Sequence, residues 1–303
     1  KRYGVIGCEE TYPTQPGITI DVPKNTNKFE QIKTFYVKRA KAIYPPFWIL
    51  SLYIPLSMIR HFLADGNPFF MGSPFKLLLT VIGFDGYARL FGVDTYAFCG
   101  DWFVGAIVML YLLYPLLAKC YRKAPIVTLV TLAILYVSQF LFPIKYDELF
   151  SALPITLIFK FCMGFALIEN LDRLRNRRVA IAAGAIFLAI TIVTIPGSRH
   201  MDYAGMIAAF ALFAVVFYIA PRLLRHKAVP PPIQKLAALS YCVFLVQHVG
   251  IVWAQAAFIK IFTKMHWSFT QWNILALFAC TLVIIVLVAW ILKLVSDKLV
   301  QKR

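Results

Sequence analysis

The stretch NILALFACTLVIIVLVAWILKLVS at residues 273–296 holds no charged residue before Lys293, and it indicates that the chain is embedded in a lipid bilayer. A helix that rises ~1.5 Å per residue needs ~20 apolar residues to cross ~30 Å of hydrocarbon. A composition that is 60% hydrophobic and 15% charged excludes an ordinary soluble domain. The sequence therefore predicts an all-α, polytopic transmembrane helical bundle. Eight spans are expected, at 42–63, 98–118, 124–142, 149–168, 179–196, 203–221, 236–259 and 273–296.

The basic residues predict how this bundle is oriented. If residue 42 begins on the cytoplasmic side, the cytoplasmic loops hold 19 of the 31 Lys and Arg, whereas the outer segments hold seven. This is the positive-inside asymmetry of membrane proteins. It predicts a multi-pass protein of the cell membrane with both ends of the bundle in the cytoplasm. The net charge of +17 is then explained by topology and anionic lipid, and no nucleic-acid partner is expected.

Two segments differ from the apolar spans. Residues 1–31 are polar and predict a loop or extended segment, which leaves 32–303 as the membrane-embedded domain. The sequence begins without Met, so we expect further helices upstream of Lys1. The stretch 64–97 is the longest outer segment and carries Asp65, Asp85 and Asp94. Its apolar run 77–84 is too short to span, which favours a re-entrant or interfacial helix.

Polar residues within the seventh predicted span are informative because polar groups are costly in hydrocarbon. Tyr241, His248 and Gln255 are seven residues apart and share one helical stripe, with Gln247 beside the histidine. Such a stripe is expected to face the bundle interior or a water-filled cavity. Two interpretations of His248 stay open: a neutral imidazole bonded to a neighbouring helix, or a proton acceptor or substrate contact.

Basic residues at two further places are candidate anion ligands. Lys160 lies near the middle of the fourth span, where it either contacts an anionic group or snorkels to the surface. Lys38, Arg39 and Lys41 precede the first span and form a cytosolic anion site if they converge, or serve only as topology determinants. Pro45 and Pro46 follow them, at a position expected to be the first turn of a helix, where missing N–H groups are tolerated.

Three motifs give the chain a family resemblance. FYVKRAKAIYPPFW at 35–48, GDWFVGAIVMLYLLYPLL at 100–117 and LSYCVFLVQHVGI at 239–251 resemble, in this order, motifs of the acyltransferase-3 family of integral membrane O-acyltransferases. The second Arg of that family's basic motif falls on Ala42, and the acidic position of its Trp-Tyr span falls on or near Ile107. The family's first two helices, which bear its principal catalytic histidine, have no counterpart here. The chain is thus expected to be an N-terminally incomplete member of a bundle of about ten helices.

The resemblance implies an enzyme that modifies cell-envelope polysaccharide. It would move an acyl group, expected to be acetyl, from cytosolic acetyl-CoA to a hydroxyl of an extracytoplasmic or lipid-linked glycan. Acyl-CoA, the glycan acceptor and membrane lipid are thus the expected partners, with no permanently bound cofactor. The expected roles are catalysis for His248, acyl-CoA binding for Lys38, Arg39, Lys41 and Lys160, and lining of the substrate pocket for Trp102, Tyr111, Tyr241 and Gln247.

Other functions are weighed against this one. A transporter or flippase of a glycan or lipid-linked substrate would do no covalent chemistry, but proton coupling usually needs interior carboxylates, and no Asp or Glu is central in a predicted span. A glycan polymerase or ligase would be expected to carry a larger outer loop. The six cysteines form no CxxC pair, so neither a zinc site nor a disulfide framework is predicted.

Overall fold

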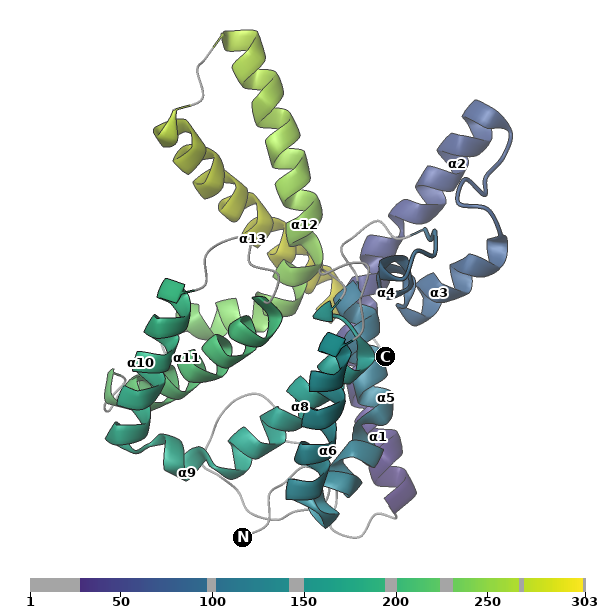
Figure 1. The fold of residues 1–303 in the computed structure, drawn as a ribbon. Coiled ribbons are helices and arrows are strands. Elements are labelled where there is room, and N and C mark those ends of the chain that lie inside the picture. Colours follow the sequence, from purple (N-terminus) through teal and green to yellow (C-terminus); the bar gives the residue numbers. More distant parts are fainter. Residues whose placement is uncertain are drawn as a thin grey trace. The chain divides into compact units, whose positions relative to one another are not determined.

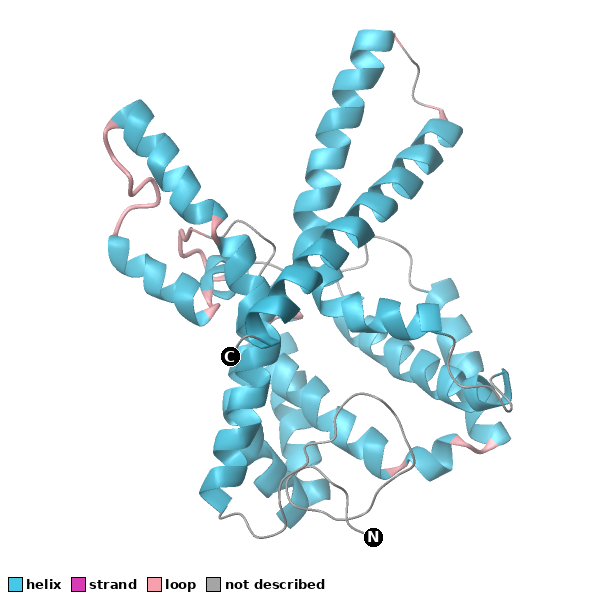
Figure 2. Ribbon diagram, turned by 180° about the vertical axis from the view of Figure 1, so that it is seen from behind, coloured by secondary structure: helices cyan, strands magenta, loops and turns pink. Residues whose placement is uncertain are grey.

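The computed structural model describes residues 28–96, 102–141, 150–193, 201–223, 231–266 and 270–301. Within these ranges the chain forms helices and connecting turns, with no β-strand (Figure 2). The chain divides into two compact units, one of residues 1–20 with 109–230 and the other of residues 21–108 with 231–303. Each unit is described by itself.

The helices follow the apolar stretches of the sequence closely (Figure 1). In chain order they are α1 (Lys28–Ser51), α2 (Tyr53–Asp65), α3 (Leu77–Ile82), α4 (Asp85–Leu90), α5 (Trp102–Lys123), α6 (Pro125–Ser138), α8 (Pro154–Glu169), α9 (Leu171–Leu174), α10 (Arg177–Val193), α11 (Met201–Leu223), α12 (Pro231–Met265) and α13 (Gln271–Gln301), with 3-10 turns η1 (Pro74–Lys76) and η2 (Gln139–Leu141).

The predicted all-α class is confirmed for the described residues, but the count of eight spans is not. In the part of the chain that the structure describes, five helical segments are long and apolar enough to cross a membrane: Glu30–Asp65, Trp102–Lys123, Tyr203–Arg222, Ile233–Met265 and Gln271–Val300. The other three predicted spans contain α6, α8 and α10, which have 14, 16 and 17 residues. They are shorter than the ~20 residues that a straight crossing takes.

The first predicted span begins at the wrong residue. α1 starts at Lys28, so Pro45 and Pro46 lie inside a helix and not in its first turn. Each proline lacks an N–H, which removes the helical donor for the carbonyls of Lys41 and Ala42. α1 is followed by α2 after a break at Leu52, and together they make a 36-residue apolar segment.

The polar segment 1–31 is mostly outside the described residues. Only its last four residues are described, and they form the first turn of α1. The apolar run 77–84 holds the short helix α3 of six residues, and the expectation that it is re-entrant or interfacial stays a prediction.

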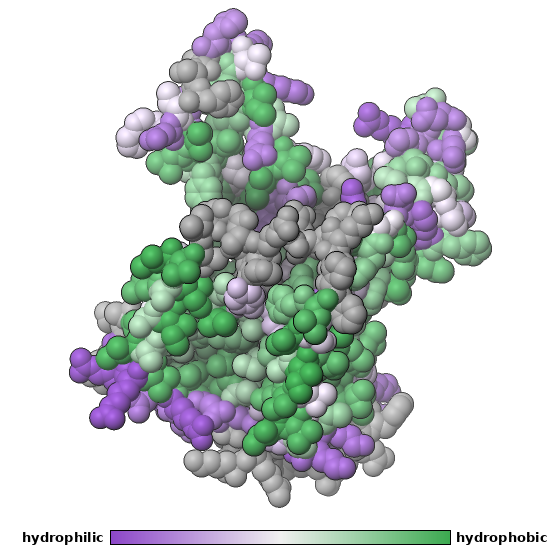
Figure 3. Space-filling view, viewed as in Figure 1, coloured by the Kyte–Doolittle hydropathy of each residue, from purple (hydrophilic) through white to green (hydrophobic). Residues whose placement is uncertain are grey.

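The unit that contains residues 109–230 holds two helix pairs. α6 and α8 pack through the buried rings of Tyr136, Phe150 and Phe159, while α10 and α11 lie side by side (Figure 1). The α10–α11 contact uses small buried residues, Ala183 and Ala211 among them, which allow two backbones to approach closely in a membrane. In Figure 3, hydrophobic side chains cover α10 and α11, and hydrophilic ones gather around α9.

The other unit is built around the helical hairpin of α12 and α13, with α1 packed on α13 (Figure 1). Gly250 allows α12 and α13 to approach closely, because a Cβ at this position would lie only 2.9 Å from Cγ1 of Ile285. The short helices α3 and α4 and the first residues of α5 belong to the same unit.

Candidate functional site

The basic residues of α1 differ in how firmly they are held. Lys38 and Lys41 are exposed, whereas Arg39 is half-buried. The Arg39 guanidinium carbon lies 5.4 Å from the ring centroid of Phe35, a buried residue one turn earlier. A cation over an aromatic face is attracted to it, and the contact fixes the stem of Arg39. The cluster thus combines one guanidinium that lies over an aromatic ring with two exposed ammonium groups.

Tyr241 joins α12 to α1 just after this cluster. Its hydroxyl donates a hydrogen bond of 3.1 Å to the carbonyl oxygen of Ile43. Ile43 directly follows Lys41 and Ala42, whose carbonyls lack a helical donor because of Pro45 and Pro46. The predicted pocket residue Tyr241 is therefore brought by a specific contact to the part of α1 that follows the basic cluster.

The polar stripe of α12 is only partly buried within its own unit. His248 and Gln255 are exposed, and Gln247 is half-buried. The buried face of α12 is instead apolar and consists of Leu239, Cys242, Leu245, Val246 and Ala254. The expectation that this stripe faces the bundle interior or a water-filled cavity stays a prediction. The role of His248 in chemistry stays a prediction.

Trp102 is the first residue of α5 and is half-buried. Its neighbour Phe103 packs against Phe244 of α12, with 4.6 Å between ring centroids. Phe244 lies between Tyr241 and Gln247 on α12, so the start of α5 meets the part of α12 that carries three predicted site residues.

Tyr111 and Lys160 belong to the other unit, on α5 and α8. Both are half-buried. They are therefore not brought together with the α1 cluster by any contact described here, and their expected roles stay predictions. Within the described residues, no group of three or more His, Cys, Asp or Glu could hold a metal ion.

The short helices α3 and α4 dock on the middle of α1. The hydroxyl of Tyr44 donates to the carbonyl of Ile82 at 3.1 Å, and the Trp48 indole N–H donates to that of Val81 at 3.0 Å. The last carbonyls of a helix have no partner within it, and these two aromatic side chains supply donors for α3. The segment that follows α2 is thus held only three to seven residues beyond Lys41.

α4 also packs tightly on the start of α5. A Cβ on Gly105 would lie 2.5 Å from Cβ of Tyr87 and 3.2 Å from the carbonyl oxygen of Gly83. Gly83 itself has φ +80° at the end of α3, where the left-handed conformation favours glycine. Two glycines therefore permit a close contact between α4 and α5.

Asp85 is a functional candidate that the sequence did not single out. It is the first residue of α4 and is 1% exposed. Neither carboxyl oxygen has a hydrogen-bond partner in the described part of the chain, and the same is true of the buried hydroxyl of Thr80. Burial raises the pKa of Asp85 to about 6, and an interaction with the side chain of Thr80 offsets part of that rise. Its position directly after the apolar run 77–84 does not by itself predict burial.

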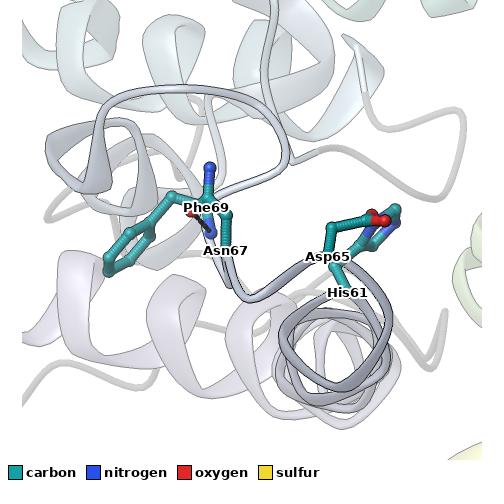
Figure 4. Close-up of polar contacts among 4 residues, drawn as sticks. All are labelled: His61, Asp65, Asn67 and Phe69. Atoms are coloured by element: carbon teal, nitrogen blue, oxygen red, sulfur yellow. Dashed lines mark hydrogen bonds and ion pairs between the residues drawn. The ribbon is translucent and has the colours of Figure 1, made fainter.

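A histidine–carboxylate pair closes the end of α2 (Figure 4). His61 Nδ1 lies 3.5 Å from Oδ2 of Asp65, and the His61 ring stacks on Phe70 with 4.3 Å between centroids. The following turn is held by the Asn67 side chain, whose oxygen accepts from the Phe69 N–H at 2.9 Å. Asp65 is largely exposed, so this pair stabilises the helix end only modestly.

These features define a class of protein, a multi-pass helical membrane protein with a basic helix end, a docked short segment and a buried carboxyl. The comparison with known proteins gives its family. The acyltransferase-3 model, described as an acyltransferase domain, matches residues 23–294, and the chain belongs to that family. No curated protein and no solved structure matches it.

Proposed function

We propose that the protein is a membrane O-acyltransferase that takes an acyl group, expected to be acetyl, from cytosolic acyl-CoA and passes it to a hydroxyl of an extracytoplasmic or lipid-linked glycan. The observation that carries the proposal is the family match over residues 23–294, which includes every proposed site residue. The α1 cluster and the contacts of α12 supply the physical support.

The donor end is assigned to the cytosolic start of α1. Lys38, Arg39 and Lys41 offer positive charge to the phosphates of CoA, and a guanidinium binds phosphate through two parallel hydrogen bonds. Arg39 suits this role because Phe35 already restricts its stem, which lowers the entropy lost on binding. Lys160 is assigned a further contact with the anionic donor.

The reaction needs a base for the acceptor hydroxyl and donors for the developing thioester oxyanion. A neutral imidazole takes up protons near neutral pH, and in this chain we assign that role to His248. Its exposed position leaves it accessible to a hydroxyl. Trp102, Tyr111, Tyr241 and Gln247 are assigned to the walls of the pocket, where Tyr and Gln also provide hydrogen-bond donors.

The test is transfer of labelled acetyl from acetyl-CoA in membranes that hold the full-length protein, with membranes of cells lacking it as the control. The proposal predicts label in the glycan fraction that mild alkali releases, as an ester is released. If the glycan instead crosses the membrane without acetyl-CoA and stays unlabelled, the protein is a transporter or flippase and the proposal is wrong.

A further inference from the structure

Asp85 and Thr80 form a buried polar pair within an otherwise apolar segment. Asp85 is 1% exposed, Thr80 is 8% exposed, and none of their side-chain oxygens has a hydrogen-bond partner among the described residues. Buried polar groups are nearly always bonded, because an unpaired one keeps the full cost of losing water. A pair of adjacent unsatisfied groups in a rigid surrounding therefore suggests that a third polar group binds between them.

The surrounding structure is rigid and fixes both groups. The backbone carbonyl of Asp85 accepts a hydrogen bond of 3.2 Å from the buried hydroxyl of Thr95, which ties the start of α4 to the loop after it. Thr80 lies on α3, whose last carbonyls are held by Tyr44 and Trp48. The backbone on both sides of the pair is thus held by named contacts, and Thr80 lies close enough to Asp85 to lower its pKa.

We propose that Asp85 and Thr80 bind the hydroxyl groups of the glycan acceptor. A carboxylate accepts hydrogen bonds at both oxygens, and a threonine hydroxyl both donates and accepts, so the pair matches the adjacent hydroxyls of a sugar. The side chains of Val104, Phe47 and Tyr44 lie around the neighbouring Gly83, and small-molecule sites commonly combine such apolar and aromatic walls with a few polar groups. This inference rests on the proposed acyltransferase function and names the acceptor side of the same site.

The location on α1 supports an acceptor role over a purely structural one. α3 docks on Tyr44 and Trp48, three and seven residues beyond Lys41, which is ~5–10 Å along a helix axis. The acceptor would therefore be held near the proposed donor end. α4 lies between Gly83 and Gly92, both at φ +80°, so Asp85 is carried by a short helix with a glycine turn at each end.

The experiment measures apparent KM for two substrates in membranes that hold the full-length protein. The acceptor probe is glycan extracted from the membranes of the producing cells, and the donor is labelled acetyl-CoA. Asp85→Asn keeps the shape of the side chain and is expected to raise the KM for glycan about tenfold or more, with the KM for acetyl-CoA changed less than twofold. Asp94→Asn, an exposed acid in the same outer segment, is the matched control and should change neither.

The pH dependence separates binding from folding. In the wild type the KM for glycan should rise as pH falls through about 6, because protonation removes the acceptor charge of Asp85. The Asp85→Asn variant should lack this dependence. Thr80→Val should also raise the KM for glycan and move the wild-type transition to higher pH, since Thr80 lowers the pKa of Asp85.

An unchanged KM for glycan in both variants, whatever the yield of folded protein, would mean that the pair holds only a buried water and would overturn the inference. A wild type that transfers no acetyl would instead refute the proposed function, and this inference with it. The two failures are thus distinguished by the activity of the wild type.

Discussion

Arg39 is the basic residue of α1 with the most restricted side chain, held by the Phe35 ring at 5.4 Å. Arg39→Ala is expected to raise the KM for acetyl-CoA about 10- to 100-fold with little change in kcat, because a hydrogen bond to a charged group contributes ~1.5–3 kcal/mol. Arg39→Lys should recover only part of this, since an ammonium group cannot bind phosphate through two parallel bonds.

The matched control for Arg39 is Lys33→Ala, earlier on the same helix, where Lys33 is exposed and lies 3.7 Å from Glu30. This control variant should leave the KM for acetyl-CoA and kcat unchanged. Equal KM values for the wild type and Arg39→Ala would remove Arg39 from the donor site.

His248 is predicted to act as the base. His248→Ala should lower kcat by ~100-fold or more, the usual contribution of a positioned acid–base group. Gln255→Ala is the control, because Gln255 is exposed on the same stripe of α12. Labelled-acetyl transfer at saturating donor measures both variants, and normal turnover in His248→Ala would exclude this residue from the mechanism.

Asp85 makes a prediction about stability as well as binding. Its folded pKa of about 6 lies above the ordinary 3.8, so the ionised carboxyl destabilises the fold. This cost is absent below pH 3.8, grows between pH 3.8 and 6, and is complete above pH 6. At pH 8 Asp85→Asn should therefore stabilise the protein by roughly 3 kcal/mol at most, from 1.36 kcal/mol per pKa unit.

The measurement is the difference in thermal midpoint between Asp85→Asn and the wild type in detergent at pH 5 and pH 8. The difference should be positive and larger at pH 8. A variant that is less stable than the wild type at pH 8 would show that the carboxylate has a structural partner.

Gly105 controls the contact between α5 and α4. In Gly105→Ala the new Cβ would lie 2.5 Å from Cβ of Tyr87, so one helix must move. Overpacking of this kind costs ~1–3 kcal/mol, and we expect a lower thermal midpoint together with slower transfer.

Gly164 on α8 provides the control for Gly105, because nothing lies within 4 Å of a Cβ at that position. Gly164→Ala should be neutral or stabilising by up to ~1 kcal/mol, as expected for Gly to Ala within a helix. If both variants have the same thermal midpoint, the close approach of α4 and α5 is not required.

The helical elements show what sequence patterns can and cannot predict. Long apolar runs such as 273–296 lie within single helices, because backbone groups in lipid must bond within their own segment. The start of α1 was predicted 14 residues too late, since prolines that normally mark a first turn here lie inside the helix. Spacing alone also does not predict which stripe of α12 is buried, and the buried residues of α12 are apolar.

The candidate site was predictable only in part. Lys38, Arg39, Lys41 and Tyr241 could be identified from motifs, and in the structure Tyr241 bonds the carbonyl of Ile43, two residues beyond Lys41. Asp85 could not be ranked above Asp65 or Asp94 by sequence. Its burial depends on the docking of α3 and α4 on α1, which is a tertiary contact without a local signature.

For the molecule as a whole, the apolar helices and the family match agree on a multi-pass membrane acyltransferase. The uneven distribution of Lys and Arg adds the proposal that the α1 cluster faces the cytosol. Donor and acceptor would then be drawn from opposite sides of one membrane.

The most direct measurement adds labelled acetyl-CoA, which does not cross lipid, to sealed membrane vesicles of the two orientations that carry the full-length protein. Inverted vesicles, with their cytosolic face outward, should transfer label to glycan, and right-side-out vesicles should do so only after they are permeabilised. Transfer by intact right-side-out vesicles at the rate of inverted ones would contradict the account.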